Sequence, residues 1–303
     1  MKRYDVVIIG CGPAGLQAAV HAVRKKARVL VLGRAEASSL YRAHVENYLC
    51  VDGVVEGARM IETGMEQARR FGAELLPHDV LAVRQAGELY EVEVADGSTV
   101  TCAALIFATG TSRKKLKVPG EKEFAGRGVS YCVDCDANFF RNAKVAVVGD
   151  ESAAVDGALT LLRYASEVTL VAAELNIPEE LRAKLAASSV RRVAGKVREI
   201  RGGNAVTDLL LEDGSAIEVE GVFIELGAKG AIELATNLGV MLDSETFTHI
   251  ETDRKQATNL PGVWAAGDIA GQPYQMAKAV GEGCVAGWEA ANYARKLRPE
   301  GER

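Results

Sequence analysis

The residues best able to do chemistry stand together in the segment Ser130–Asn138, which reads SYCVDCDAN. Cys132 and Cys135 form a C-x-x-C, and Asp136 follows the second cysteine directly. This spacing occurs in redox dithiols, in which one thiolate attacks a disulfide, and in zinc sites, in which two such pairs hold one ion. It can also arise by chance. The rest of the sequence has to decide between these possibilities and, for a redox pair, has to supply a source of electrons.

The bulk composition is that of an ordinary globular protein with two domains. The chain has 303 residues, 48% of them hydrophobic and 25% charged, and this length favours two domains over one. The net charge of −5 argues against nucleic-acid and membrane-surface binding. No signal-peptide pattern opens the sequence and no run of about 18 apolar residues interrupts it, so we expect a cytoplasmic protein. In that reducing compartment the other four cysteines are expected to be isolated core or loop thiols: Cys11, Cys50, Cys102 and Cys284.

A dinucleotide-binding unit opens the chain. A predicted strand, Val6–Ile9, meets a G-x-G-x-x-G turn of Gly10, Gly12 and Gly15, and a helix and a second strand, Val29–Leu32, follow. Glycines at such a turn let a pyrophosphate approach the backbone, and the helix N-terminus supplies N–H donors and the positive end of its dipole. Because the elements come in the right order, this turn is a specific signal for a bound dinucleotide.

The same unit returns in the middle of the chain. It consists of a strand, a helix and a strand, predicted at Val145–Val148, Ser152–Tyr164 and Val168–Val171. Gly149 follows Gly10 by the same 139 residues that separate Val168 from Val29 (149 − 10 = 168 − 29 = 139). We therefore predict an α/β protein with two Rossmann-like dinucleotide-binding domains, the second inserted in the first.

The second turn differs from the first in its charge. Asp150, Glu151 and Ala154 replace the residues equivalent to Cys11, Gly12 and Gly15. At ~4 Å and an effective dielectric near 20, each contact of a carboxylate with a phosphate costs about 4 kcal/mol. We expect these carboxylates to cap the helix instead and the second unit to be structural at this point.

Two later segments suit a flavin nucleotide. The strand LIFATG, Leu105–Gly110, ends in a glycine that could pass close under a cofactor, and a strand near the C-terminus delivers Gly267 and Asp268 before a helix from about Gln275. Asp268 could accept hydrogen bonds from a polyol, and the N-terminus of that helix could face a ring that becomes negative on reduction. The polar, Gly-rich segment between Pro119 and Cys132 is predicted to be a hinge.

Taken together, these motifs resemble a low-molecular-weight thioredoxin reductase across almost the whole chain. The segments that carry the resemblance are GCGPAG, HVENY, LIFATGTS, GRGVSYCVDCD, YASEVTLV and GVWAAGDIAGQPYQMA. The resemblance implies FAD as cofactor, thioredoxin or a thioredoxin-like protein as partner, and a homodimer. It also implies a discontinuous FAD-binding domain, residues 1–117 and 242–303, and an NADPH-like domain, residues 118–241, that carries the dithiol.

The resemblance assigns roles to the dithiol and to the flavin contacts. Cys135 matches the thiol that faces the flavin, Cys132 the thiol that attacks the partner disulfide, and Asp136 the acid that moves protons. No second C-x-x-C and no His pair supports zinc, so we expect no metal. The FAD contacts that the resemblance implies are Gly10, Gly12, Pro13, Ala14, Gly15, Gly33, Asn47, Val80, Ala108, Thr109, Gly110, Gly267, Asp268, Met276 and Ala277. The usual Arg-Gln of the family has become Gln275-Met276.

The middle domain departs from the family at its nucleotide site. Besides the altered turn, Ala172, Ala173 and Glu174 replace the His and arginines that hold the 2′-phosphate of NADPH. We therefore expect a disulfide reductase for which NADPH is not the donor, resembling the pyridine-nucleotide-independent, ferredoxin-linked type. The basic cluster Arg113–Lys117 is a candidate docking patch for ferredoxin. The alternatives are a flavin dithiol oxidase that uses oxygen, conventional but weak use of NADPH or NADH, and a non-catalytic flavin redox sensor.

Overall fold

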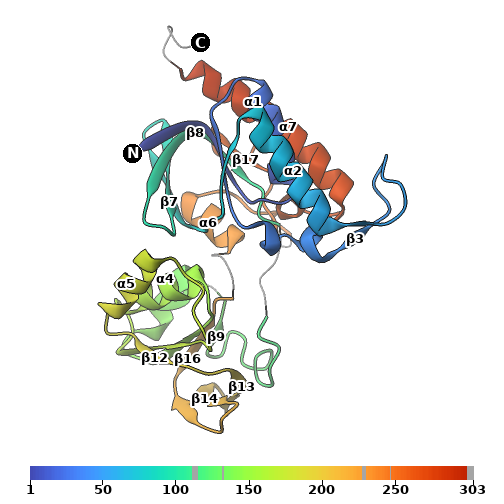
Figure 1. Cartoon of the computed structure of the whole chain (residues 1–303). Coiled ribbons are helices and arrows are strands. Elements are labelled where there is room, and N and C mark those ends of the chain that lie inside the picture. The colour runs from blue at the N-terminus through green and yellow to red at the C-terminus, as the bar shows by residue number, and fades with distance from the viewer. Residues whose placement is uncertain (111–114, 132, 227–229, 246, 299–303) are drawn as a thin grey trace. The chain divides into compact units, whose positions relative to one another are not determined.

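The computed structural model describes residues 1–110, 115–131, 133–226, 230–245 and 247–298, without the side chains of Asp134, Cys135 and Ala231. The chain forms two compact units (Figure 1). The first consists of Met1–Val94, Ser98–Thr111 and Leu234–Arg303, and the second of Ala95–Gly97 and Ser112–Glu233. Among the described helices, none combines the length and the apolar character that crossing a membrane requires.

The first unit is built on a seven-stranded mixed sheet. Its strand order is β5-β2-β1-β8-β7-β6, and β17 also pairs with β8. The strands are β1 (Lys2–Ile9), β2 (Val29–Leu32), β5 (Glu74–Leu76), β6 (Val80–Ala86), β7 (Leu89–Val94), β8 (Thr99–Phe107) and β17 (Val263–Ala265). β1, β2, β5, β8 and β17 pair in parallel, so their carboxyl ends meet at one edge. That edge is where a doubly wound sheet binds its ligand.

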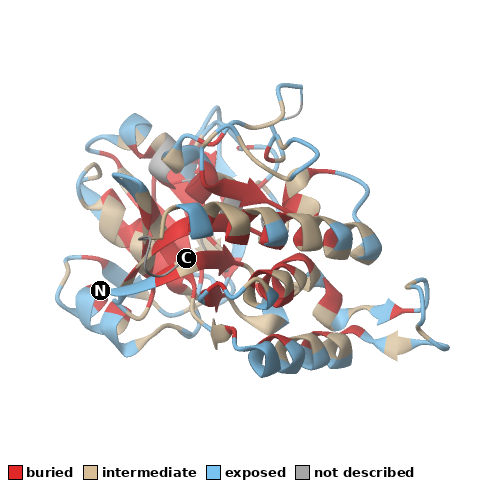
Figure 2. Cartoon of the chain, turned by 90° about the horizontal axis from the view of Figure 1, so that it is seen from above, coloured by how far each residue is buried: buried red, intermediate tan, exposed pale blue. Residues whose placement is uncertain are grey.

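Helices α1 (Pro13–Arg24), α2 (Gly57–Phe71) and α7 (Met276–Lys296) pack in this unit. Figure 2 shows the buried residues concentrated on the strands and on the inner faces of the helices. α1 and α7 approach closely at two glycines of α7. A Cβ at Gly283 would lie 2.2 Å from the carbonyl oxygen of Ala14, and one at Gly287 would lie 2.2 Å from that of Ala18. The close packing of helix on helix therefore ties the C-terminal helix to the glycine turn.

Shorter elements complete the first unit. They are the hairpin β3 (His44–Val45) and β4 (Val55–Glu56), and the 3₁₀ turns η1 (Ala35–Ala37), η2 (Ser39–Arg42) and η4 (Asp268–Ala270). The last boundary between the two units along the chain, between Glu233 and Leu234, falls within helix α6 (Ala231–Leu238).

The second unit repeats the plan with a five-stranded parallel sheet of order β12-β11-β10-β16-β9. The strands are β9 (Val129–Ser130), β10 (Lys144–Val148), β11 (Glu167–Val171), β12 (Arg191–Val193) and β16 (Gly221–Ile224). The helical elements are α3 (Val133–Asp136), η3 (Ala137–Phe140), α4 (Ser152–Leu161) and α5 (Glu179–Ala186). A separate antiparallel sheet contains β13 (Val197–Gly202), β14 (Val206–Leu211) and β15 (Ala216–Glu218).

The internal repeat is confirmed at the level of strand register. Val6 pairs with Val29 in the first unit, and Val145 pairs with Val168 in the second. Both pairs are shifted by the same 139 residues (145 − 6 = 168 − 29 = 139). The prediction of two Rossmann-like units is therefore correct down to the residues that lie side by side.

The prediction of a hinge between Pro119 and Cys132 is wrong over its described part. The Pro119 carbonyl accepts a hydrogen bond from Ile200 N–H, and a Cβ at Gly120 would lie 1.9 Å from the Ile200 oxygen. Phe124 is buried in the core of the second unit. Gly120 serves close backbone packing against β13 here, which composition alone does not distinguish from flexibility.

Candidate functional site

The turn between β1 and α1 has the shape of an anion cradle. Gly10 has φ +121°, and a Cβ there would lie 2.2 Å from the Ala108 oxygen. A Cβ at Gly15 would lie 2.0 Å from the Gly10 oxygen, so both positions require glycine. At Gly12 the nearest atom to a Cβ is the hydroxyl oxygen of Ser38, 3.2 Å away. The first turn of α1 carries no acidic residue and no side-chain cap, so its N–H groups are available to a phosphate.

The end of β8 lies beside this turn and has an unused donor. Thr109 Oγ1 is buried and has no hydrogen-bond partner among the described residues. Buried polar groups are nearly always satisfied, so a bound group is expected to supply the partner. Ala108 is buried directly before it, and Gly110, with φ +69°, turns the chain away.

The end of β2 lies close to the same turn. A Cβ at Gly33 would lie 3.3 Å from the Cys11 nitrogen, and Gly33 has φ +137°. The next residue, Arg34, is paired with Asp79 at 3.3 Å, and Asp79 is buried directly before Val80. The sequence does not reveal this ion pair. It joins the residue after Gly33 to the residue before Val80, and so it links two predicted FAD contacts that are far apart in the chain.

Two side chains of α7 hold the Gly267–Asp268 loop from both sides. Glu282 accepts a hydrogen bond from Gly267 N–H at 2.8 Å, and Lys278 Nζ donates to the Gly267 oxygen at 2.8 Å. Lys278 also donates to the Gly271 oxygen, and its ammonium lies 3.1 Å from the Glu282 carboxylate. Lys278 and Glu282 were missed by sequence reasoning because neither belongs to a recognisable motif. Their effect is to fix the position of Asp268.

Burial raises the pKa of Asp268, and the positive charge of Lys278 opposes this rise. An Asp whose pKa is raised in the folded state stabilises the fold most when it is protonated, and this contribution is lost as the pH rises through the raised pKa. An ionised Asp268 at neutral pH therefore costs stability in the free protein, as expected for a residue kept to bind a ligand.

The N-terminus of α7 meets the hairpin segment that carries Asn47. Asn47 Nδ2 donates to Gln275 Oε1 at 3.2 Å, and Gln275 is the N-cap residue of α7. Met276 and Ala277 are the first two residues of that helix, so their backbone N–H groups have no partner within it. The structure thus brings Asn47 close to the start of α7, where Met276 and Ala277 lie, although more than 200 residues separate them in the sequence (276 − 47 = 229).

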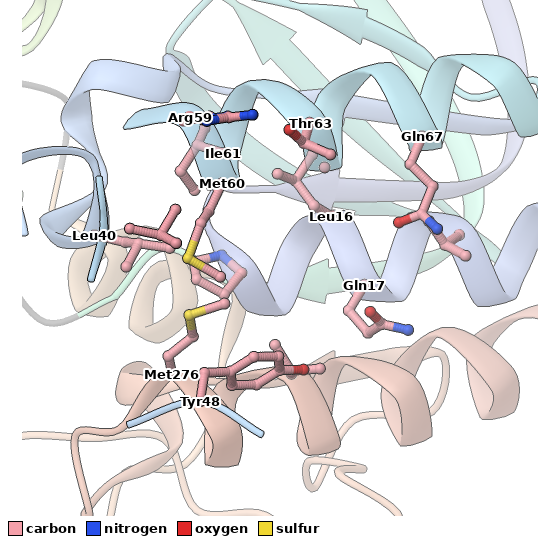
Figure 3. Close-up of a pocket in the computed structure, with 15 residues that line it drawn as sticks. Leu16, Gln17, Leu40, Tyr48, Arg59, Met60, Ile61, Thr63, Gln67 and Met276 are labelled. Atoms are coloured by element: carbon pink, nitrogen blue, oxygen red, sulfur yellow. The ribbon is translucent and has the colours of Figure 1, made fainter. Parts of the chain in front are cut away.

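A pocket of about 260 Å³ opens between α1, α2, α7 and the hairpin segment. Figure 3 shows Met60, Met276 and Tyr48 gathered at one end of it, with Gln17 and Gln67 further along. Two of the predicted FAD contacts, Pro13 and Met276, are among the described residues that line this pocket. The pocket therefore lies beside the expected path of the flavin nucleotide.

In the second unit, the structure describes the surroundings of the dithiol but not the dithiol itself. Cys132 and the side chain of Cys135 lie outside the described residues. Asp136 is half-buried, and its Oδ2 accepts a hydrogen bond from the hydroxyl of Ser130 at 2.7 Å. Val133 N–H donates to Glu225 Oε1 at 3.2 Å.

The residue before the dithiol is also held. Tyr131 donates its hydroxyl to Glu121 at 2.9 Å, and burial, with this hydrogen bond, raises the pKa of Tyr131 to about 12. Glu121 is buried and also accepts the backbone N–H groups of Leu116 and Lys117. Two buried carboxyl groups, those of Glu121 and Glu225, therefore accept hydrogen bonds from the two residues that flank Cys132 in the sequence.

The two segments that depart from the nucleotide site of the family, the turn at Asp150 and the segment Ala172–Glu174, lie close together. The backbone N–H of Asn176 donates to the backbone carbonyl oxygen of Asp150 at 2.8 Å. This hydrogen bond joins the turn after β10 to the segment after β11. Asp150 and Glu174 are exposed, and Ala173 beside Glu174 is exposed as well. A phosphate in front of α4 would therefore meet carboxylates on both segments.

The expected capping of α4 is wrong for Glu151. Glu151 is the N-cap residue, but its side chain makes no capping hydrogen bond. Good N-caps are the short side chains of Ser, Thr, Asp and Asn, whereas the Glu side chain is one methylene longer than Asp. Glu151 therefore does not serve α4 as a capping side chain.

Comparison with known proteins agrees with this architecture. A sequence model of the pyridine nucleotide-disulphide oxidoreductases matches residues 4–283, and the chain belongs to that family. The thioredoxin reductase of Listeria monocytogenes is 35% identical over 317 aligned positions, covering 98% of this chain and 96% of its own. That of Bacillus subtilis is 33% identical, with coverage of 98% and 96%.

Two solved structures are also similar. The atypical thioredoxin reductase of Desulfovibrio vulgaris Hildenborough matches with a TM-score of 0.82 and 35% identity, covering 97% of this chain and 99% of its own. A ferredoxin-flavin thioredoxin reductase of Clostridium acetobutylicum matches with a TM-score of 0.70 and 33% identity, covering 98% and 99%. Within its family the chain is a thioredoxin-reductase-like flavoprotein, an oxidoreductase that uses FAD. The glycine cradle and the unsatisfied Thr109 hydroxyl fit that cofactor.

Replacing Lys278 by Met should release the Gly267–Asp268 loop. Losing hydrogen bonds from a partly buried charge costs roughly 1.5–3 kcal/mol, so FAD affinity should fall at least about tenfold and the melting temperature of the holoprotein should drop. Flavin content and differential scanning fluorimetry would measure both. Arg295→Met, at the exposed far end of α7, is the matched control. Unchanged affinity and melting temperature in Lys278→Met would show that the clamp is unimportant.

Asp268→Asn should separate stability from binding. Because burial raises the pKa of Asp268, removing its charge near pH 7 should leave the apoprotein equally or more stable. FAD binding should weaken by about tenfold or more, since a charged acceptor is lost. Thermal melts of the apoprotein and flavin-fluorescence titration test the two effects. A destabilised apoprotein with normal FAD affinity would contradict this assignment.

Proposed function

We propose that this chain reduces thioredoxin or a thioredoxin-like protein with electrons that do not come from NADPH. In this proposal the first unit binds FAD, and the second carries the Cys132–Cys135 dithiol. The observation that carries the proposal is the contrast between two equivalent helix N-termini. Cys11 and Gly12 immediately precede α1, whereas Asp150 and Glu151 immediately precede α4.

This contrast has a predictable energetic effect. A carboxylate ~4 Å from a phosphate costs about 4 kcal/mol at an effective dielectric near 20. Asp150 is exposed and solvent weakens the repulsion there, but a remaining ~1.4 kcal/mol still lowers affinity tenfold. The same ligand would also find Ala172, Ala173 and Glu174 where a 2′-phosphate needs cationic forks. Two independent contacts for NADPH are therefore replaced by neutral or negative groups.

The dithiol performs disulfide exchange in two steps. The Cys132 thiolate attacks one sulfur of the partner disulfide, forming a mixed disulfide and releasing one partner thiolate. The Cys135 thiolate then attacks the Cys132 sulfur, which releases the second partner thiolate and leaves a Cys132–Cys135 disulfide. The two thiolates take up two protons, one of them from Asp136, which the Ser130 hydroxyl holds in position. Once reduced by the external donor, a bound FAD would supply the two electrons that restore the dithiol, and flavin chemistry allows those electrons to arrive one at a time.

A one-electron protein such as ferredoxin is the donor that we propose. Support comes from the clostridial relative, which is described as a ferredoxin-flavin thioredoxin reductase, and from the charge pattern of the nucleotide turn. Arg113 and Lys114 of the candidate docking cluster Arg113–Lys117 lie outside the described part of the chain. The proposal therefore rests on the nucleotide turn and not on that cluster.

A survey of electron donors tests the proposed function. Under anaerobic conditions, flavin absorbance of the holoprotein should be bleached by reduced ferredoxin and left unchanged by excess NADPH or NADH. With thioredoxin present, the ferredoxin-reduced protein should then produce free thiols. The Cys132→Ser variant, which should keep its flavin but lose disulfide turnover, is the control for the relay.

Other outcomes of this survey favour other functions. Rapid bleaching by NADPH would refute the proposal. Bleaching by a small dithiol, with rapid return of colour in air, would identify a dithiol oxidase. A flavin that responds only to a chemical reductant would identify a sensor.

Restoring positive charge should restore binding of the nucleotide. The combined substitutions Asp150→Gly, Glu151→Gly, Ala173→Arg and Glu174→Arg should raise NADPH affinity by at least about tenfold, because each ~1.4 kcal/mol gained is a factor of ten. Isothermal titration of the holoprotein with NADPH measures this affinity. The matched control, Glu179→Arg with Glu180→Arg on the exposed start of α5, changes charge elsewhere in the second unit. Equal affinity in both variants would show that geometry rather than charge excludes NADPH.

A further inference from the structure

A serine hydroxyl lies over the glycine turn of the first unit. A Cβ built on Gly12 would meet Ser38 Oγ at 3.2 Å and Ser38 Cβ at 3.9 Å. Apart from its chain neighbours, no other heavy atom of the described residues would lie within 4 Å of that Cβ. Gly12 is the N-cap residue of α1, so this open space is where a phosphate would meet the first N–H groups of the helix. The hydroxyl of Ser38 therefore borders the position that the turn keeps open for a phosphate.

Backbone contacts hold Ser38 in this place. Its N–H donates to the Ala35 oxygen at 3.0 Å, and its carbonyl oxygen accepts a hydrogen bond from Tyr41 N–H at 3.0 Å. Leu40 is buried in the core of the first unit. A Cβ at Gly57, the first residue of α2, would lie 1.8 Å from the Leu40 oxygen, so the loop packs backbone to backbone on that helix. The hydroxyl is thus brought to the glycine turn by contacts in which it takes no part.

The hydroxyl of Ser38 is not used by the fold. Ser38 is the N-cap residue of η2, with φ −68° and ψ 135°, but its side chain makes no capping hydrogen bond. Serine is among the residues that cap helices best, so a hydroxyl in this position would ordinarily be used in that way. It also forms no other hydrogen bond with the described part of the chain. The hydroxyl can therefore donate its proton to a group that binds at the turn.

The second unit has no hydroxyl at the corresponding place. Its loop after β11 also meets the turn after β10, because Asn176 N–H donates to the Asp150 oxygen at 2.8 Å. The offset of 139 residues that relates the two units places Ile177 at the position of Ser38 (38 + 139 = 177). The unit with an uncharged turn therefore has a hydrogen-bond donor beside that turn, whereas the unit with an acidic turn has an aliphatic side chain.

We propose that Ser38 is a further FAD-binding residue, whose hydroxyl donates a hydrogen bond to a phosphate oxygen of the dinucleotide. Phosphate oxygens are negatively charged, and a hydrogen bond to a charged acceptor is stronger than one between neutral groups. The N–H groups of α1 and the Ser38 hydroxyl would then bind the phosphates from two different segments of the chain. The role of Ser38 rests on the assignment of FAD to the first unit and is independent of the electron donor and of the dithiol.

The experiment measures binding to the apoprotein, with and without the hydroxyl. Ser38→Ala should weaken FAD binding about tenfold in a flavin-fluorescence titration, because a hydrogen bond to a charged group is lost. Isothermal titration with ADP, which carries a diphosphate but no flavin, should show a similar loss of affinity. The melting temperature of the apoprotein should stay unchanged, because the hydroxyl makes no hydrogen bond with the described residues.

Three further variants make the result specific. Ser38→Thr keeps the hydroxyl and should retain most of the affinity for FAD. Ser38→Asp places a carboxylate beside the phosphates and should weaken FAD and ADP by about a hundredfold. Ser39→Ala removes the hydroxyl of the exposed neighbouring residue and should match the wild type, which makes it the control.

Unchanged affinity for FAD in Ser38→Ala, or an equal loss in Ser39→Ala, would overturn the role of Ser38. So would a loss for FAD with normal binding of ADP, because the hydroxyl would then act on the flavin half of the cofactor. Gly12→Glu, which gives the first turn the residue of the second, tests the site itself. Normal FAD binding in Gly12→Glu would refute the assignment of FAD to the first unit. Loss of binding there, with normal binding in Ser38→Ala, would refute the role of Ser38 alone.

Discussion

The charge in front of a helix N-terminus distinguishes the two halves of this protein. Both units place a strand, a tight turn and a helix in the same register, and both turns start with a glycine, Gly10 or Gly149. An N-terminus without acidic residues favours a phosphate, because its N–H groups and dipole are positive there. Asp150 and Glu151 reverse that preference in the second unit while the fold stays the same. A difference of two side chains thus gives two similar turns opposite charge.

The flavin site depends on contacts between distant parts of the chain. Gly283 and Gly287 allow α7 to approach α1 until backbone and backbone meet, which brings the last helix to the first turn. From that position Lys278 and Glu282 hold both polar groups of Gly267. The contacts of the Gly267 loop with α7 are thus present without a cofactor.

Much of the fold and part of the site were predictable, for identifiable physical reasons. The glycine turn, the repeat and its register follow local rules that the sequence displays directly, and the pairing of Val145 with Val168 confirms them. Lys278 and Glu225 were not predictable, because their partners are backbone groups that only the folded chain brings near. The capping role of Glu151 was predicted wrongly, since charge and position suggested a cap but side-chain length does not favour one. For Lys278 and Glu225 the missing information was three-dimensional.

The central claim is that the second unit does not accept NADPH, and direct binding tests it most simply. Isothermal titration of the oxidised wild-type holoprotein with NADPH at low salt avoids any assumption about catalysis. The account predicts a dissociation constant of about 1 mM or weaker, a binding free energy no better than about −4 kcal/mol. A dissociation constant of about 1 μM, or about −8 kcal/mol, would contradict it.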